Sequence, residues 1–135
     1  MPKLSISFIR TALIYLLLGF TAGGLLLIQK GINFESRIWI LLPIHIEWMI
    51  MGWVFQLVMG VAFWILPRFS NPPVRGNVIT AIFAYFILNF GIVIIFMVNL
   101  FRLNETLELI GRISEAIAVI LFVIHAWPRV RAFSD

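Results

Sequence analysis

The sequence predicts an all-α integral membrane protein, a four-helix transmembrane bundle that forms one domain over residues 1–135. Composition is the first reason, since 62% of the residues are hydrophobic, 12% are charged and the mean hydropathy is +1.07. A soluble domain is about 45–50% apolar and about 25% charged, and a chain this short has too little interior to bury the excess. The second reason is a set of four apolar stretches, each near or above the roughly 20 residues that a helix needs to cross a bilayer.

The predicted spans cover residues 11–28, 38–66, 78–100 and 107–127, and residues that break helices separate them. Lys30 and Gly31 follow the first span, and residues 67–76 and 102–104 follow the second and third. The second span is the longest and contains Pro43. Because proline is tolerated in the first turn of a helix, Pro43 is expected to mark the start of this helix or a kink in it.

The basic residues lie in short clusters between the spans, which is the pattern that sets orientation in a membrane and not one that indicates nucleic-acid binding. One side carries Lys3, Arg10, Arg68, Arg75, Arg129 and Arg131. The other side carries Lys30, Arg37, Arg102 and Arg112. Since six basic residues face four, both termini are predicted to be cytoplasmic, in a multi-pass protein of the cell (inner or plasma) membrane.

Few polar residues fall inside the predicted spans, and ionisable groups in a span are functional candidates because lipid makes them costly. Steps of three or four residues from His45 on the second span form one stripe, which continues with Met49, Gly52, Gln56 and Gly60. Glycines on such a stripe allow close approach of either another helix or a flat cofactor. On the first span, Gly19 and Gly23 form a G-x-x-x-G pair that predicts helix packing.

The stretch around this stripe, PIHIEWMIMGWVFQLVMGVAFWILPRF (residues 43–69), resembles the second transmembrane helix of subunit I in the haem-copper oxidase superfamily, in its cbb3-type and nitric-oxide-reductase branches. It is also similar to the histidine-rich helix of the NnrS family, where Glu47 replaces a second histidine. The resemblance implies that His45 is an axial ligand of haem b near the outer face. The histidine cluster of the copper centre and the ligand of a high-spin haem are missing, so no oxidase activity is assigned to this chain.

A haem-binding reading extends to further residues. Met49, Gly52, Gln56 and Gly60 share the stripe of His45 and are predicted to contact the cofactor. The propionates need cationic partners near the outer surface, for which Arg37 and Arg112 are candidates. The alternative for these two arginines is an ion-pair ladder or an anchor at the membrane interface.

The second haem ligand is not expected to be His125. That residue lies near the inner end of its span and His45 near the outer end of its own, so the two differ in depth by roughly 15–20 Å. A second copy of the chain can instead bring its own His45 to equal depth, which predicts a homodimer with a bis-histidine haem. If His45 is the sole protein ligand, the iron keeps one open coordination site that can bind NO or O2. The haem would then serve gas binding as well as electron transfer to a redox partner.

Two other functions compete with this hypothesis. Glu47 is a carboxylate inside a span, so the chain can be a small, dimeric, proton-coupled four-helix transporter. The chain can also be an accessory subunit that packs against a respiratory oxidase complex, with His45 merely hydrogen-bonded. Gln56 and Asn89 are predicted to form hydrogen bonds between helices.

Overall fold

The computed structural model describes residues 1–130, so Arg131 of the predicted inner charge cluster lies outside the described residues. The regular secondary structure of residues 1–130 is entirely helical. The helices are α1 (Lys3–Ile32), α2 (Leu41–Glu47), α3 (Gln56–Ile65), α4 (Val78–Phe101) and α5 (Glu105–Ala126). A 3₁₀ segment, Ser36–Ile40, leads into α2, and a π-helical segment, Trp48–Phe55, joins α2 to α3. The second rod of the bundle therefore runs without a break from residue 36 to residue 65.

Three of the rods are long and apolar enough to cross a membrane, namely Lys3–Ile32, Ser36–Ile65 and Val78–Phe101. They contain almost all of the predicted spans 11–28, 38–66 and 78–100. The fourth predicted span, 107–127, corresponds to α5, which is not among these three and carries its charged residues, Glu105, Glu108, Arg112 and Glu115, in its first half.

Side-chain caps and left-handed residues set the helix ends. Asn77 and Asn104 precede α4 and α5, and each side chain accepts a hydrogen bond from the backbone N–H two residues later. Asn33 and Arg102 end α1 and α4 with φ near +50°, the conformation that turns the chain out of a helix. Pro43 lies in the first turn of α2, which confirms the expected position at the start of an α-helix.

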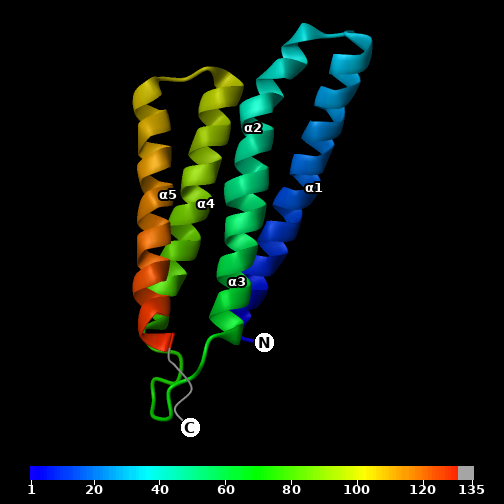
Figure 1. The fold of residues 1–135 in the computed structure, drawn as a ribbon. Coiled ribbons are helices and arrows are strands. Elements are labelled where there is room, and N and C mark those ends of the chain that lie inside the picture. The colour runs from blue at the N-terminus through cyan, green and yellow to red at the C-terminus, as the bar shows by residue number, and fades with distance from the viewer. Residues whose placement is uncertain (131–135) are drawn as a thin grey trace.

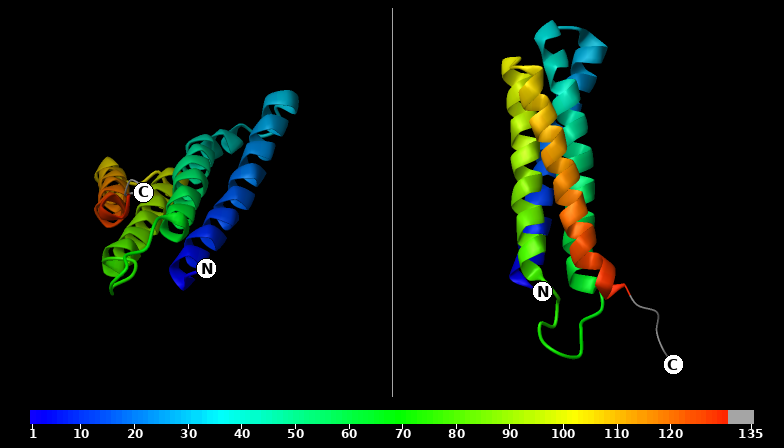
Figure 2. Two further views of the ribbon diagram at one scale, coloured as in Figure 1. Left: turned by 60° about the horizontal axis from the view of Figure 1, so that its bottom comes forward. Right: turned by 90° about the vertical axis from the view of Figure 1, so that its left-hand side faces the viewer.

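The rods form two hairpins that lie side by side (Figures 1 and 2). One is α1 with α2 and α3, the other is α4 with α5, and the second rod and α4 join them. The start of α1, the end of α3, the start of α4 and the end of α5 lie at one end of the bundle, where Ser5 of α1 donates to the carbonyl of Gly60 (2.7 Å). His45 and the start of α5 lie toward the opposite end (Figure 1).

All four rods contribute to an aromatic core near the end that holds the start of α1. Phe8 of α1 is fully buried and meets Tyr85 of α4 edge to face at 5.0 Å and Phe122 of α5 at 6.2 Å. Phe63 of α3 completes this core. Toward the other end Trp48 of the second rod stacks on Phe96 of α4 at 5.3 Å, and a polar contact described below also joins the two hairpins.

Candidate functional site

His45 lies on α2 against the backbone of α1. Its Nδ1 atom is 2.8 Å from the carbonyl oxygen of Gly19, and a Cβ atom at Gly23 would lie 2.8 Å from the imidazole Cε1. Because a carbonyl oxygen only accepts hydrogen bonds, Nδ1 donates, and the neutral ring keeps its lone pair on Nε2. No residue within 1–130 hydrogen-bonds Nε2. Gly19 and Gly23 are thus a packing pair, as predicted: Gly23 makes room for the imidazole, and Gly19 makes room for the Met49 side chain, whose Sδ would lie 2.6 Å from a Cβ atom there.

The half-buried imidazole lines an apolar groove of about 460 Å³ between α1 and the start of α2. Cavities of about 300–1,000 Å³ are the usual size of small-molecule and cofactor sites. Gly24 forms part of the groove, and a Cβ atom there would meet nothing within 4 Å. The lining consists of Phe20, Gly23, Gly24, Leu26, Leu27, Lys30, Trp39, Leu42, His45 and Met49.

The rest of the predicted stripe faces α1 and not this groove. A Cβ atom at Gly52 would lie 2.5 Å from the Tyr15 ring, and one at Gly60 would lie 2.6 Å from Phe8. Gln56 is fully buried and donates to the carbonyl of Phe8 at 3.4 Å. The cofactor-contact prediction for Gly52, Gln56 and Gly60 is therefore replaced by helix packing, because the first helix already occupies the space that their faces leave.

The two arginines predicted to bind propionates are not in the groove. Arg37 lies exposed in the 3₁₀ segment, where its backbone N–H donates to the Glu35 carboxylate at 3.1 Å. Arg112 lies on α5 and borders a different pocket, which Glu47 also lines. The ion-pair alternative holds for Arg112, which contacts Glu115 at 3.3 Å and Glu108 at 4.0 Å.

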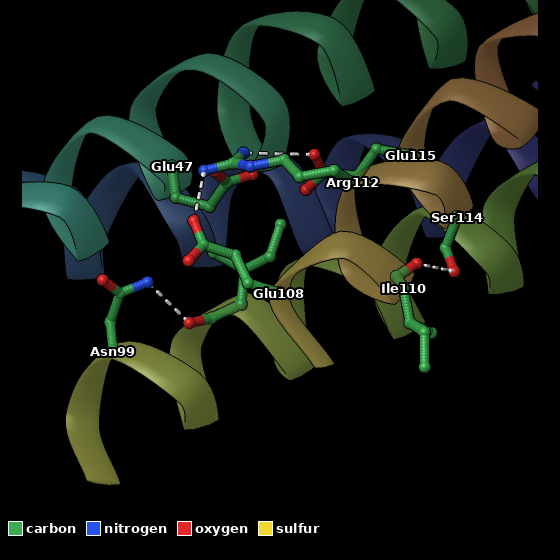
Figure 3. Close-up of polar contacts among 8 residues, drawn as sticks. Glu47, Asn99, Glu108, Ile110, Arg112, Ser114 and Glu115 are labelled. Atoms are coloured by element: carbon green, nitrogen blue, oxygen red, sulfur yellow. Dashed lines mark hydrogen bonds and ion pairs between the residues drawn. The ribbon is translucent and has the colours of Figure 1, made fainter. Parts of the chain in front are cut away.

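Arg112 also makes a contact that links the two hairpins. Its Nη1 donates to the Glu47 carboxylate on α2, so one guanidinium joins Glu47 and Glu115, as Figure 3 shows. The Glu47 and Glu115 side chains are 4% and 5% exposed, whereas that of Arg112 is 47% exposed. The sequence singled out Glu47 and the α5 ladder separately, but no local signal indicated that they meet.

His125 is a structural residue at the other end of the bundle. Its Nδ1 donates to the carbonyl of Asn77 (2.8 Å), its Nε2 lies 3.1 Å from Arg129, and its ring stacks on Phe63 at 5.1 Å. Phe63 follows His45 by 18 residues along the continuous second rod, which amounts to about 27 Å of helix. The structure therefore keeps the two histidines apart, in agreement with the expected difference in depth.

The remaining polar predictions for the spans are confirmed. Asn89 of α4 accepts a hydrogen bond from the Tyr15 hydroxyl of α1 at 3.2 Å, and Gln56 bonds to α1 as described. Thr11 and Tyr85 add a further link between α1 and α4 at 2.8 Å. These bonds satisfy polar groups that would otherwise face an apolar interior.

Within residues 1–130 no three His, Cys, Asp or Glu side chains gather into a group that could hold a metal ion. A haem makes a smaller demand, since its macrocycle supplies four nitrogens and the protein needs to supply only axial ligands. The histidine that fits this demand is His45, with one ring nitrogen anchored and the other available. No protein-family model, curated protein or solved structure matches the chain.

Proposed function

We propose that this chain is a four-helix integral membrane protein that binds haem b in the groove between α1 and α2, with His45 Nε2 as an axial ligand. One observation carries the proposal: His45 lines an apolar groove, donates its Nδ1–H to the Gly19 carbonyl, and has no hydrogen-bond partner for Nε2 among residues 1–130. Metal-ligating histidines almost always donate their second ring N–H to a carbonyl or carboxylate, because this fixes the tautomer and the ring orientation.

The groove residues suit a flat, largely apolar ligand. Gly23 and Gly24 bring the α1 backbone to the wall of the groove, where a side chain would keep a macrocycle away. Leu26, Leu27 and Leu42 supply apolar contact area. A bound haem would supply one-electron redox chemistry or a site for a diatomic gas, and the protein sets its access and polarity.

The membrane setting of the proposal follows from charge and composition. With four crossings, α5 included, the basic cluster at the end that holds the start of α1 is cytoplasmic, and His45 lies toward the outer face. An amphipathic helix such as α5 can cross when its charged residues pair within the bundle, as Arg112 does with Glu47.

A homodimer accounts best for a second axial ligand. The residues that line the groove all belong to α1 and the second rod and none to α4 or α5, and α1 leaves apolar side chains such as Leu17, Phe20 and Leu27 exposed. A parallel two-fold dimer through α1 places two His45 side chains at equal depth. Such a dimer predicts a bis-histidine spectrum with one haem per two chains, whereas a five-coordinate haem predicts binding of NO or O2.

Reconstitution of the purified full-length protein with haemin tests the proposal. Wild-type protein should develop a Soret band at a fixed haem-to-chain ratio, and His45→Ala should lose it. His125→Gln is the matched control, because it removes the other histidine from the far end of the bundle. Retention of the wild-type spectrum by His45→Ala would overturn haem ligation by this residue.

Proton-coupled transport through Glu47 and service as an accessory subunit remain alternatives with less support. Arg112 pairs with the Glu47 carboxylate, which favours a role in holding the hairpins together over a role as a free carrier site. A colourless protein whose Glu47→Gln variant loses proton-coupled transport would favour the first alternative. A colourless protein that co-purifies with oxidase subunits would favour the second.

A further inference from the structure

Lys30 is the charged residue among those that line the groove of His45. It lies in the last turn of α1 and is exposed, and its side chain forms no hydrogen bond or ion pair with any of residues 1–130. The ion pairs of the described chain all involve Arg112. The groove thus combines an apolar lining, one imidazole and one ammonium group whose charge no carboxylate of residues 1–130 neutralises.

The two polar groups lie at different positions along the groove. His45 meets α1 at Gly23, and Lys30 follows Gly23 by seven residues on the same helix. Seven residues correspond to about 10 Å along a helix axis and to nearly two full turns, so Gly23, Leu27 and Lys30 share one face. A ligand that is bound at His45 and extends toward the end of α1 would carry its far edge to Lys30.

We infer that Lys30 binds an acidic group of the ligand held at His45, which for haem b is a propionate carboxylate. The inference rests on the proposed function and names a counter-charge for it within the same groove. A carboxylate in apolar surroundings is costly unless a cation pairs with it, and charge-assisted hydrogen bonds are the strong ones. The separation along α1 is comparable to the reach from the centre of a haem to its propionates.

Lys30 replaces Arg37 and Arg112 as the proposed partner of the propionates, because of where these residues lie and which charges surround them. Arg112 borders another pocket and is surrounded by Glu47, Glu108 and Glu115, so its charge is already neutralised. Arg37 is not among the residues that line the groove. The competing role for Lys30 is general: a lysine at the end of a membrane helix reaches toward the interface and interacts with the helix dipole.

Binding of a ligand carboxylate by Lys30 can be distinguished from a general anchoring role if the charge of the ligand is changed as well as the charge of the protein. Purified full-length protein is titrated with haemin and with haemin dimethyl ester, in which both carboxylates are esterified. Four proteins are compared: wild type, Lys30→Met, Lys30→Arg and the control Lys3→Met, which removes an exposed lysine from the opposite end of α1.

Wild-type protein should bind haemin about tenfold more tightly than the dimethyl ester, since a hydrogen bond to a charged group is worth roughly that factor or more. Lys30→Met should bind both compounds with the affinity that wild type has for the ester. Lys30→Arg and Lys3→Met should keep the wild-type preference. An anchoring role alone predicts that Lys30→Met changes both affinities by the same factor.

The failures of the two proposals are distinguishable. If His45→Ala removes haemin binding but Lys30→Met keeps the wild-type preference for haemin over the ester, the Lys30 assignment is overturned and haem ligation stands. If haemin binding is absent or does not depend on His45, the proposed function is overturned, and the Lys30 assignment falls with it.

Discussion

Arg112 of α5 donates a hydrogen bond to the buried carboxylate of Glu47, which lies 65 residues earlier in the chain on α2. The same guanidinium contacts the equally buried Glu115. Two carboxyl groups inside the bundle thus depend on one arginine that itself remains half exposed. Trp48, the residue after Glu47, stacks on Phe96 of α4 at 5.3 Å, so a polar and an aromatic contact together join the two helical hairpins at this end of the bundle.

Removal of this arginine should destabilise the protein. In Arg112→Gln the Glu47 carboxylate loses its cationic partner while it stays buried, and an unsatisfied buried acceptor costs about 1–3 kcal/mol. Thermal unfolding in detergent measures the loss. Arg37→Gln, which changes an exposed arginine, is the control and should leave the midpoint unchanged. The double variant Glu47→Gln/Arg112→Gln should recover part of the loss, because a neutral amide replaces the unpaired charge; strict additivity would contradict the pairing.

The fit of His45 to α1 should be sensitive to one methyl group. Gly23→Ala places a Cβ atom 2.8 Å from the imidazole Cε1, so the ring or the helix must move. Overpacking of this kind costs about 1–3 kcal/mol. The variant should have a lower unfolding midpoint and weaker haemin binding than wild type.

Gly31→Ala is the matched control for this effect. It lies on the same helix, does not line the groove, and has nothing within 4 Å of its new Cβ atom. Since alanine is favoured over glycine inside helices by roughly 0.5–1 kcal/mol, Gly31→Ala should be neutral or slightly stabilising. Equal effects of the two substitutions would show that the close contact between His45 and α1 is not formed.

The second hairpin has its own close approach, at Gly91 of α4. A Cβ atom there would lie 2.8 Å from the backbone carbonyl of Gly111 on α5. A Cβ atom at Gly111 would meet Cγ1 of the buried Ile95 side chain at 2.6 Å, and its distance to the nearest backbone atom, the Gly91 carbonyl oxygen, would be longer, at 3.2 Å. We therefore expect Gly91→Ala to lower the unfolding midpoint more than Gly111→Ala does. The reverse order in a thermal melt would contradict this helix register.

Arg129 should be the least replaceable basic residue at the end that holds the start of α1. It is fully buried, contacts His125 Nε2, and donates to backbone carbonyls where the second rod ends, those of Phe63, Leu66 and Pro67. Lysine keeps the charge but not the planar fork of donors. Arg129→Lys should therefore lose roughly 2–3 kcal/mol of stability.

Arg68→Lys is the matched control for Arg129, since Arg68 is exposed in the adjoining loop. It should unfold at the wild-type denaturant concentration. Denaturant unfolding of the three proteins in the same detergent measures the difference, and a wild-type midpoint for Arg129→Lys would refute the capping role.

The expected spans agree closely with the observed rods, because long apolar runs and the polar breaks between them are local properties of the chain. Pro43 is where its fixed φ is tolerated, and Asn77 and Asn104 cap the helices that they precede. The π-helical segment from residue 48 to residue 55 has no such local signal. It forms where Gly52 packs on the Tyr15 ring, which is a contact with another helix.

The candidate site also has features that local sequence signals predict and features that depend on contacts between helices. Periodicity placed His45, Met49, Gly52, Gln56 and Gly60 on one face, and they do share it. Periodicity does not state what covers a face, and α1 covers all of it except the part next to His45 and Met49. The sequence indicates Lys30 only as a helix-end residue and as a member of one basic cluster, because its place in the groove of His45 depends on how α1 and α2 pack.

The sequence by itself determined that the chain is built from apolar helices, which residues form their apolar centres, and which few polar residues lie within them; α1 extends beyond the expected span 11–28 at both ends, from Lys3 to Ile32. These properties follow from the length and period of the apolar pattern, which short-range chemistry controls. Only the tertiary structure decided that Arg112 belongs to Glu47 and that His45 and Lys30 line one groove. Such pairings depend on the rotation and spacing of helices that are distant in the chain, and side-chain packing sets both.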